Sequence, residues 1–276
     1  MLFGRYKHFS DISPACYELS EKKEILRRHL QNIRSQEHFA AQQSRNQLPE
    51  LVFAHRSQLV KKGKGIDPVL QENKVVNIGL ATARMNGLII HPGEVYSFWK
   101  LVGTVTEKKG YKDGRVLLHN KLIPGPGGGL CNLANTINLL ILHSPLEITE
   151  FHTHSDALAP DPGERIPFSA GTSVSYNYID YRFKNTTDQD FQLFIWCEDG
   201  QLCGELRCEH PIQWEYRIVE EDHHFHPEGS EYYRVSKIYR NTYEKITGAL
   251  VEHKLVWDNH SLVMFDHDMI PKEQIR

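Results

Sequence analysis

The sequence predicts an α+β protein, in which a mixed or antiparallel sheet carries a cysteine-bearing helix and a helical extension lies at the N-terminus. Four segments of the 276-residue chain lead to this prediction. Residues 15–45 are charged and rich in helix formers, and residues 131–142 repeat apolar side chains at helical spacing. Residues 174–208 are rich in strand-forming patterns, and 213–265 alternate aromatic and β-branched residues with charges. We therefore expect three parts: an N-terminal helical extension (1–50), a central domain (51–210) and a C-terminal β-rich extension packed on that domain (211–276).

The elements before the cysteine follow from simple patterns. A thin apolar stripe along the first helix predicts that this helix rests on the main domain through Leu19, Leu26, Leu30 and Ile33. Residues 61–68 form a polar connector, and 75–88 repeat small and apolar residues on one helix face. Pro92 and Gly93 then predict a turn before a strand at 95–99.

Cys131 occupies the most informative position in the chain. It follows a glycine run and begins a predicted amphipathic helix with Leu133, Ile137, Leu140 and Ile141 at helical spacing, ended by Pro145. The positive end of a helix dipole lowers a thiol's pKa, which favours a nucleophilic thiolate. We then expect the backbone N–H groups around Gly128 and Gly129 to form an oxyanion site. The structural alternatives are a buried, inert cysteine and a turn that simply needs glycine dihedrals.

A candidate base lies shortly downstream of Cys131. Residues 146–156 read as a strand that projects His152, His154 and Asp156 from one face. A cysteine at a helix start with a histidine on a neighbouring strand is the pairing of nucleophile and base in thiol acyl transfer. A carboxylate then holds the imidazole in the required tautomer.

Two other polar clusters give weaker signals. The cluster Asp222, His223, His224 and His226 would bind a divalent cation only if the segment is extended, and we expect solvated side chains and no metal. The set Cys197, Cys203, Cys208 and His210 matches no zinc-knuckle spacing, so we expect half-buried strand positions. Residues 176–183 alternate as a strand, with Asp180 available to orient His154 or to pair with Arg182.

Composition narrows the function classes. A net charge of −3 with dispersed Lys and Arg excludes the basic stripe of a nucleic-acid-binding protein. The N-terminus lacks the apolar segment of a secretory signal, and no run approaches the length of a membrane span. Five scattered cysteines do not form a disulfide framework. We therefore expect a cytoplasmic protein with no cofactor, while the oligomeric state stays open.

Several runs of residues resemble the VanW family. The most specific are the Gly-Glu-x-x-Ser-Phe run at 93–98 and Gly127-Gly-Gly-Leu-Cys131, accompanied by 71–77, Gly110-Tyr-Lys-Asp-Gly114, His154 and 176–185. The resemblance covers roughly residues 50–210. It implies a link to glycopeptide (vancomycin) resistance, and some proteins with this domain behave as L,D-transpeptidases that cross-link peptidoglycan through a cysteine acyl-enzyme. The chain has Asn132 where the family commonly has Gln, and it lacks an Asp common near 170–174, so Asp156 or Asp180 would orient the imidazole.

Together these features favour cysteine-dependent acyl transfer on a peptidoglycan stem peptide or precursor. Cys131 would attack a carbonyl, His154 would move the proton, and N–H groups from Gly128, Gly129 and Asn132 would hold the oxyanion. Lys112 and Asp113 would bind a substrate amine or carboxylate, or form a solvated turn. The alternatives are a non-enzymatic accessory module that binds a cell-wall peptide, and a metal-dependent hydrolase.

Overall fold

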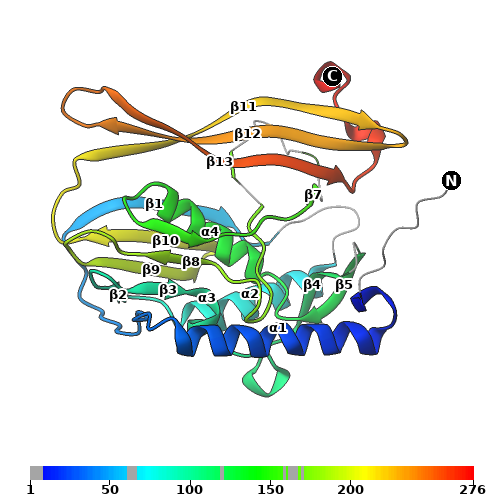
Figure 1. Cartoon of the computed structure of the whole chain (residues 1–276), viewed down its shortest axis with the longest axis horizontal. Helices are drawn as coiled ribbons and strands as arrows, with labels where there is room; N and C mark the ends of the chain where they lie inside the picture. The colour runs from blue at the N-terminus through cyan, green and yellow to red at the C-terminus, as the bar shows by residue number, and fades with distance from the viewer. Residues whose placement is uncertain (1–8, 61–66, 119–120, 158–159, 161–166, 169–170) are drawn as a thin grey trace.

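The computed structural model describes residues 9–60, 67–118, 121–157, 160, 167–168 and 171–276. It confirms the α+β class (Figure 1). The helices are α1 (Pro14–Arg34), α2 (Pro68–Thr82), α3 (Phe98–Val102) and α4 (Leu130–Leu142), with short 3-10 turns at 9–11, 107–109, 267–269 and 272–274. The strands are β1 (Glu50–Gln58), β2 (Leu88–Ile90), β3 (Val95–Ser97), β4 (Asp113–Leu118), β5 (Lys121–Pro126), β6 (Glu147–Glu150), β7 (Asp156–Ala157), β8 (Arg182–Lys184), β9 (Phe191–Glu198), β10 (Gln201–Cys208), β11 (Trp214–Glu228), β12 (Glu231–Glu244) and β13 (Leu250–Val263).

The strands form two main sheets and two smaller ones. The central sheet has the antiparallel order β1-β10-β9-β2, and the C-terminal strands form the order β11-β12-β13-β7, in which only β7 is parallel to its neighbour. Strands β3-β8-β6 make a third sheet, and β4 and β5 a separate hairpin. Figure 1 shows the C-terminal sheet above the central one, with α4 between them and α1 along the opposite side of the molecule.

A tight turn joins β9 and β10. Asp199 and Gly200 both adopt positive φ angles, 49° and 72°. This conformation matches the right-handed twist of two antiparallel strands, and Asp-Gly is one of the few pairs that adopt it readily.

Helix α4 is buried on every side from Leu133 to Leu142. Leu133, Ile137, Leu140 and Ile141 enter the main core, as their spacing predicts. Leu139 and Leu142 instead pack with Ile238 and Trp257 of the C-terminal sheet. The prediction of an amphipathic helix is therefore wrong, because a second sheet covers the face that would otherwise meet water. The helix ends at Leu142, before Pro145 as predicted.

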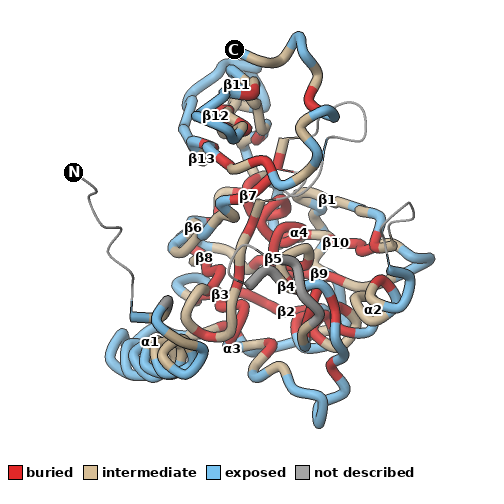
Figure 2. Tube along the Cα trace, turned by 90° about the vertical axis from the view of Figure 1, so that its right-hand side faces the viewer, coloured by how far each residue is buried: buried red, intermediate tan, exposed pale blue. Residues whose placement is uncertain are grey.

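Helix α1 docks in the opposite orientation to the predicted one. No α1 residue is buried, and the whole apolar stripe of Leu19, Leu26, Leu30 and Ile33 is exposed (Figure 2). The side that meets the body is polar, with Arg28 hydrogen-bonded to Glu150 and Asn32 to Arg182. Charged partners on the body decide which face of the helix turns inward.

Other predicted boundaries shift for local reasons. The helix expected at 75–88 is α2, which starts at Pro68 because the Asp67 side chain caps the N–H of Val69 at 2.8 Å. The strand expected at 95–99 stops at Ser97, which caps α3 in the same way. Residues 175–179 form a turn with Asn177 at φ 52°, so the strand expected at 176–183 is reduced to β8.

The connector predicted at 61–68 lies mostly outside the described residues. No helix in the described part of the chain is long and apolar enough to cross a membrane.

Candidate functional site

Cys131 is the second residue of α4, as predicted. Gly129 caps the helix at φ 102°, a conformation that favours glycine. The thiol is partly buried against the main core, and its sulfur lies 3.6 Å from the carbonyl oxygen of Val174. The sulfur therefore lies at the start of a helix, next to a glycine with a positive φ angle and a backbone carbonyl.

The protonation state of Cys131 differs from the expectation. Burial raises the pKa of the Cys131 thiol above its ordinary value of 9.0, although backbone hydrogen bonding opposes this effect. Removing water from a thiolate costs more than the backbone hydrogen bonds at Val174 and Cys131 return. The thiol is therefore protonated at neutral pH, and the prediction that the helix start lowers its pKa is wrong.

Asn77 of α2 organises the approach to Cys131. Its side chain is fully buried, and its Nδ2 donates to Lys112 O at 2.9 Å and to Gly128 O at 3.0 Å, while its Oδ1 accepts from Lys112 N at 2.8 Å. Three hydrogen bonds thus join the start of β4 to the glycine turn. The sequence pointed to Asn77 only as the last residue of a matching run, and its role depends on segments 35 and 51 residues away.

The glycine turn packs backbone against backbone. A Cβ atom on Gly128 would lie 2.3 Å from the carbonyl carbon of Gly114, and one on Gly114 would lie 2.8 Å from the Cα of Gly128. Neither position has room for a side chain. The glycines therefore serve close packing as well as the turn itself.

The predicted oxyanion donors are present only in part. Among the described residues, the N–H groups of Gly128 and Gly129 have no hydrogen-bond acceptor. The N–H of Asn132 already donates to Gly129 O at 3.0 Å, so Asn132 is not an available backbone donor. Its side-chain Oδ1 is buried without a partner in the described structure. The possible donors beside the thiol are therefore the two glycine N–H groups.

Lys112 and Asp113 lie close to the turn, with their side chains exposed. Their backbones are held by α2: Lys112 by Asn77, and Asp113 through its carbonyl oxygen, 2.8 Å from Asn73 Nδ2. Asp113 begins β4 opposite Pro126, so the segment is the start of a hairpin strand. Both side chains stay free to meet a ligand near the glycine turn.

The segment 171–174 separates Cys131 from the candidate base. On one side it meets α4, where Cys131 contacts Val174 and the Asn135 side chain accepts from the Oγ1 of Thr172 at 2.9 Å. On its other side it pairs with 152–154, with His154 N donating to Gly171 O at 2.8 Å. Cys131 and His154, the predicted nucleophile and base, therefore contact opposite edges of the extended segment 171–174.

The side chain of His154 turns away from α4. Thr153 lies directly opposite Thr172, whose hydroxyl points to α4, so the neighbouring His154 projects from the other face. On that face a Cβ on Gly171 would lie 2.9 Å from the Trp257 ring of β13. No hydrogen bond joins Cys131 and His154, both of which lie in the described part of the chain.

Asp156 lies two residues beyond His154, in strand β7 at the edge of the C-terminal sheet. Burial lowers the pKa of His154, and the Asp156 carboxylate opposes this effect. Asp156 is buried in β7, which pairs with β13, and one of its oxygens accepts from Ser155 at 3.1 Å. No hydrogen bond joins the His154 ring to Asp156 in the described structure, and the second carboxylate oxygen of Asp156 is buried without a partner. The role of Asp156 in orienting His154 therefore stays a prediction. The continuous strand expected at 146–156 is broken into β6, an isolated bridge and β7.

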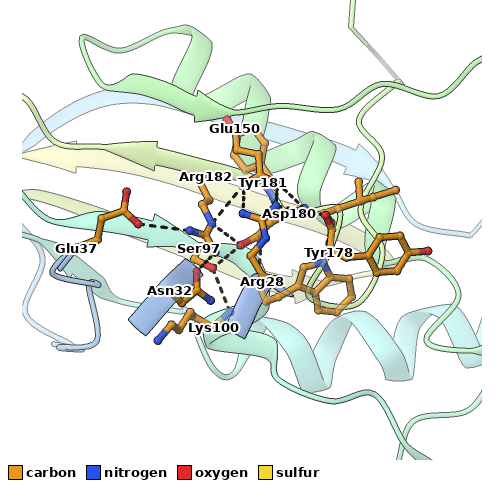
Figure 3. A network of polar contacts seen from close by, with 12 residues as sticks. Arg28, Asn32, Glu37, Ser97, Lys100, Glu150, Tyr178, Asp180, Tyr181 and Arg182 are labelled. Atoms are coloured by element: carbon orange, nitrogen blue, oxygen red, sulfur yellow. Dashed lines mark hydrogen bonds and ion pairs between the residues drawn. The ribbon is translucent and has the colours of Figure 1, made fainter. Parts of the chain in front are cut away.

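Asp180 has a different role from the predicted one (Figure 3). It is fully buried, and its Oδ2 accepts from Ser97 Oγ at 2.6 Å and from Arg182 Nε at 2.7 Å. Its Oδ1 accepts from the N–H groups of Trp99 and Tyr181. Because both oxygens are occupied, Asp180 does not orient His154. It pairs with Arg182, the structural alternative left open by the sequence.

The remaining candidates have structural roles. Nε2 of His152 lies 3.0 Å from Glu150. Cys203 and Cys208 are buried in β10, Cys197 is partly buried in β9, and Cys208 Sγ donates to the carbonyl oxygen of His210 at 3.0 Å. The described residues contain no group of three or more His, Cys, Asp or Glu side chains close enough together to bind a metal ion. This holds for the 222–226 cluster as well.

Two surface depressions lie along α1. One, of about 230 Å³, is lined by Glu24, Arg27, Arg28, Gln31 and Tyr178. The other, of about 430 Å³, is lined by Lys23, Leu26, Arg27, Leu30, Gln31 and Arg34.

Comparison with known proteins agrees with the motifs at this site. Residues 73–207 match the family model described as VanW like protein. The chain is 31% identical over 218 residues to the vancomycin B-type resistance protein VanW of Enterococcus faecalis (strain ATCC 700802 / V583), covering 79% of each chain. It is 28% identical over 113 residues to the uncharacterized protein YoaR of Bacillus subtilis (strain 168), covering 41% of this chain and 36% of that protein. No solved structure matches.

Proposed function

Because this chain belongs to the VanW family, we propose that it performs cysteine-dependent acyl transfer on a peptidoglycan stem peptide or its precursor. The observation that carries the proposal is the position of Cys131. Its thiol is partly buried in the first turn of α4, beside two glycine N–H groups that have no acceptor in the described structure. A sulfur nucleophile next to unused N–H donors is the minimum that acyl transfer needs.

The reaction has two steps. The Cys131 sulfur attacks the carbonyl carbon that precedes the terminal D-amino acid of the stem peptide, so that a C–S bond forms and the C–N bond breaks. The thiol proton passes to the leaving amine, and the product is a thioester on Cys131. An acceptor amine then attacks the thioester carbon, forms the new amide and returns a proton to the sulfur. The N–H groups of Gly128 and Gly129 would stabilise the oxyanion in both steps.

His154 stays the candidate base in this scheme, with Asp156 beside it. It can reach the thiol only if residues 171–174 move aside, because that segment hydrogen-bonds to both α4 and the His154 backbone. Lys112 and Asp113, exposed next to the glycine turn, are candidates for binding the charged groups of the peptide.

The family supports a link to glycopeptide resistance. The enterococcal relative is named for vancomycin B-type resistance. A link between this chain and glycopeptide resistance is therefore part of the proposal.

The second candidate is a non-enzymatic accessory module that binds the same peptide. It is favoured by one specific observation: burial raises the pKa of Cys131, and no imidazole contacts the sulfur among the described residues. A protonated thiol without a base can line a binding site but does not attack a carbonyl.

A single assay separates the two candidates. Purified protein is incubated with a stem tetrapeptide, and mass spectrometry follows the release of the terminal D-amino acid and any acyl adduct on the protein. We expect release by the wild type, an adduct that maps to Cys131, and loss of both in Cys131→Ser. The matched control is Cys197→Ser, which changes a partly buried thiol of β9 and should retain activity. Peptide binding without release or adduct would replace the enzyme by the binding module, and release that survives Cys131→Ser would refute the assigned nucleophile.

A further inference from the structure

Helix α1 presents an apolar face that nothing in the described structure covers. Leu19, Leu26 and Ile33 are 59%, 60% and 77% exposed, and Leu30 lies in the same stripe. Ile12, just before the helix, is also 64% exposed. Four large aliphatic side chains on one side of a single helix form a contiguous apolar surface, unlike the scattered exposed residues of an ordinary protein surface.

The orientation of this face is set by specific contacts on the opposite side of the helix. Arg28 places both terminal nitrogens on the Glu150 carboxylate, at 2.6 and 2.5 Å, and it also reaches the carbonyl oxygen of Tyr178 (Figure 3). Asn32, one turn later, accepts from Arg182 at 2.7 Å. Residues 28 and 32 lie on one face, while 26, 30 and 33 lie on the other. The body therefore holds the polar face and directs the apolar stripe outward.

The charges beside the stripe are mainly basic. Helix α1 contains five Lys and Arg residues and three Glu residues. Lys22, Lys23 and Arg27 keep 74%, 73% and 66% of their side chains exposed, and Arg34 lies at the C-terminal end beside Leu30 in the same surface depression. Glu24 is less exposed, at 36%, whereas Glu18 keeps 68% of its side chain exposed beside Lys22, so the exposed cations outnumber the exposed carboxylates. Two copies of this face would bring like charges together, whereas an anionic surface would complement them.

We propose that α1 binds the surface of an anionic lipid membrane, lying in the plane of the interface with its leucine stripe inserted among the acyl chains. An exposed apolar face flanked by Lys and Arg is the combination that interfacial helices use: aliphatic side chains partition below the headgroups while cations meet the lipid phosphates. The Arg28–Glu150 contact keeps the helix attached to the body, so the whole protein is held at the membrane surface. This inference does not depend on the proposed chemistry at Cys131.

The test is co-sedimentation of the full chain with vesicles. One set contains phosphatidylcholine alone, and the other an equal mixture of phosphatidylcholine and phosphatidylglycerol. We expect binding to the anionic vesicles that weakens as salt rises, and little binding to the neutral ones. The double variant Leu26→Gln/Ile33→Gln should bind at least about tenfold more weakly, because each side chain loses its transfer into an apolar phase. Lys23→Gln/Arg34→Gln should weaken binding to anionic vesicles only.

The matched control is Ile246→Gln, which changes an aliphatic side chain that is 92% exposed on the hairpin between β12 and β13. It should bind like the wild type. All five substituted positions are on the surface, so a thermal melt should show every variant folded. Equal binding of wild type and Leu26→Gln/Ile33→Gln would overturn the proposal, as would no binding of wild type to anionic vesicles. A dimer in light scattering that the leucine variant converts to monomer, without vesicle binding, would assign the stripe to a second copy of the chain.

Discussion

The side chain of Asn77 holds the backbone of Gly128, with Nδ2 3.0 Å from the glycine carbonyl oxygen. The same amide group makes two more hydrogen bonds, both to Lys112, and so closes the space between α2, the start of β4 and the turn that leads to Cys131. The position of the thiol therefore depends on a buried amide 54 residues earlier in the chain.

Replacing Asn77 should destabilise the protein strongly. Asn77→Ala removes three hydrogen bonds and leaves the Gly128 carbonyl and the Lys112 N–H without partners, while the Lys112 carbonyl still accepts from Gly127 N–H. The cost should be about 2 to 4 kcal/mol. The matched control is Asn73→Ala on the same helix, where one exposed hydrogen bond to Asp113 O is lost and the cost should stay below about 1 kcal/mol. Urea unfolding of both variants measures the difference. Equal urea midpoints for the two variants would show that the Asn77 hydrogen bonds do not stabilise the protein.

A methyl group at Gly128 should not be tolerated. Gly128→Ala places Cβ 2.3 Å from the backbone of Gly114, so the hairpin or the start of α4 must move, at a cost of about 2 to 4 kcal/mol. Gly79→Ala is the control: no atom lies within 4 Å of the added Cβ, and alanine in a helix should stabilise by about 0.5 to 1 kcal/mol. The unfolding temperature should fall in Gly128→Ala and rise in Gly79→Ala. A shift in the same direction for both variants would contradict the packing argument.

The docking of α1 should depend on acidic pH through Glu150. Burial by itself would raise the pKa of Glu150, but hydrogen bonds from His152 and Arg28 together with the Arg28 charge lower it from 4.5 to about 2. A carboxylate whose pKa is lower in the folded state stabilises above its unfolded pKa, and the contribution disappears as pH falls toward the folded value.

Between about pH 4.5 and 2, α1 should therefore detach progressively, which hydrogen exchange of its amides would detect. Glu150→Gln should exchange faster at neutral pH and lose that pH dependence. Unchanged α1 exchange in the variant would show that the helix is held by other contacts.

Alkylation of Cys131 should be slow at neutral pH. Because burial raises its pKa above 9.0, the thiolate fraction should climb only above that pH, and the rate of iodoacetamide labelling should rise with it. Peptide mapping identifies the labelled site, with Cys131→Ser as the blank. A rate that levels off below pH 8 would mean that the helix start outweighs burial. Faster labelling in the presence of stem peptide would point to an activated thiol in the complex.

The sequence alone determined the features that depend on neighbours in the chain. Apolar spacing after the glycine run located α4 and its cysteine, and Pro145 marked the region beyond its end. Asp199 and Gly200 specified the β9–β10 turn, since positive φ angles are set by local sterics. The family was evident for a similar reason, because its motifs are short continuous runs.

Only the tertiary structure decided which side chains meet. Its sheets cover both sides of α4, so a helix predicted as amphipathic is buried throughout. Glu150 and Arg182, more than a hundred residues beyond α1, turn its polar face inward and leave the leucine stripe outside. Residues 171–174 lie between Cys131 and His154, and Arg182 and Ser97 occupy the carboxylate of Asp180. Periodicity identifies which residues share a face of an element, but the energy of orienting that face comes from charges and packing supplied by distant segments.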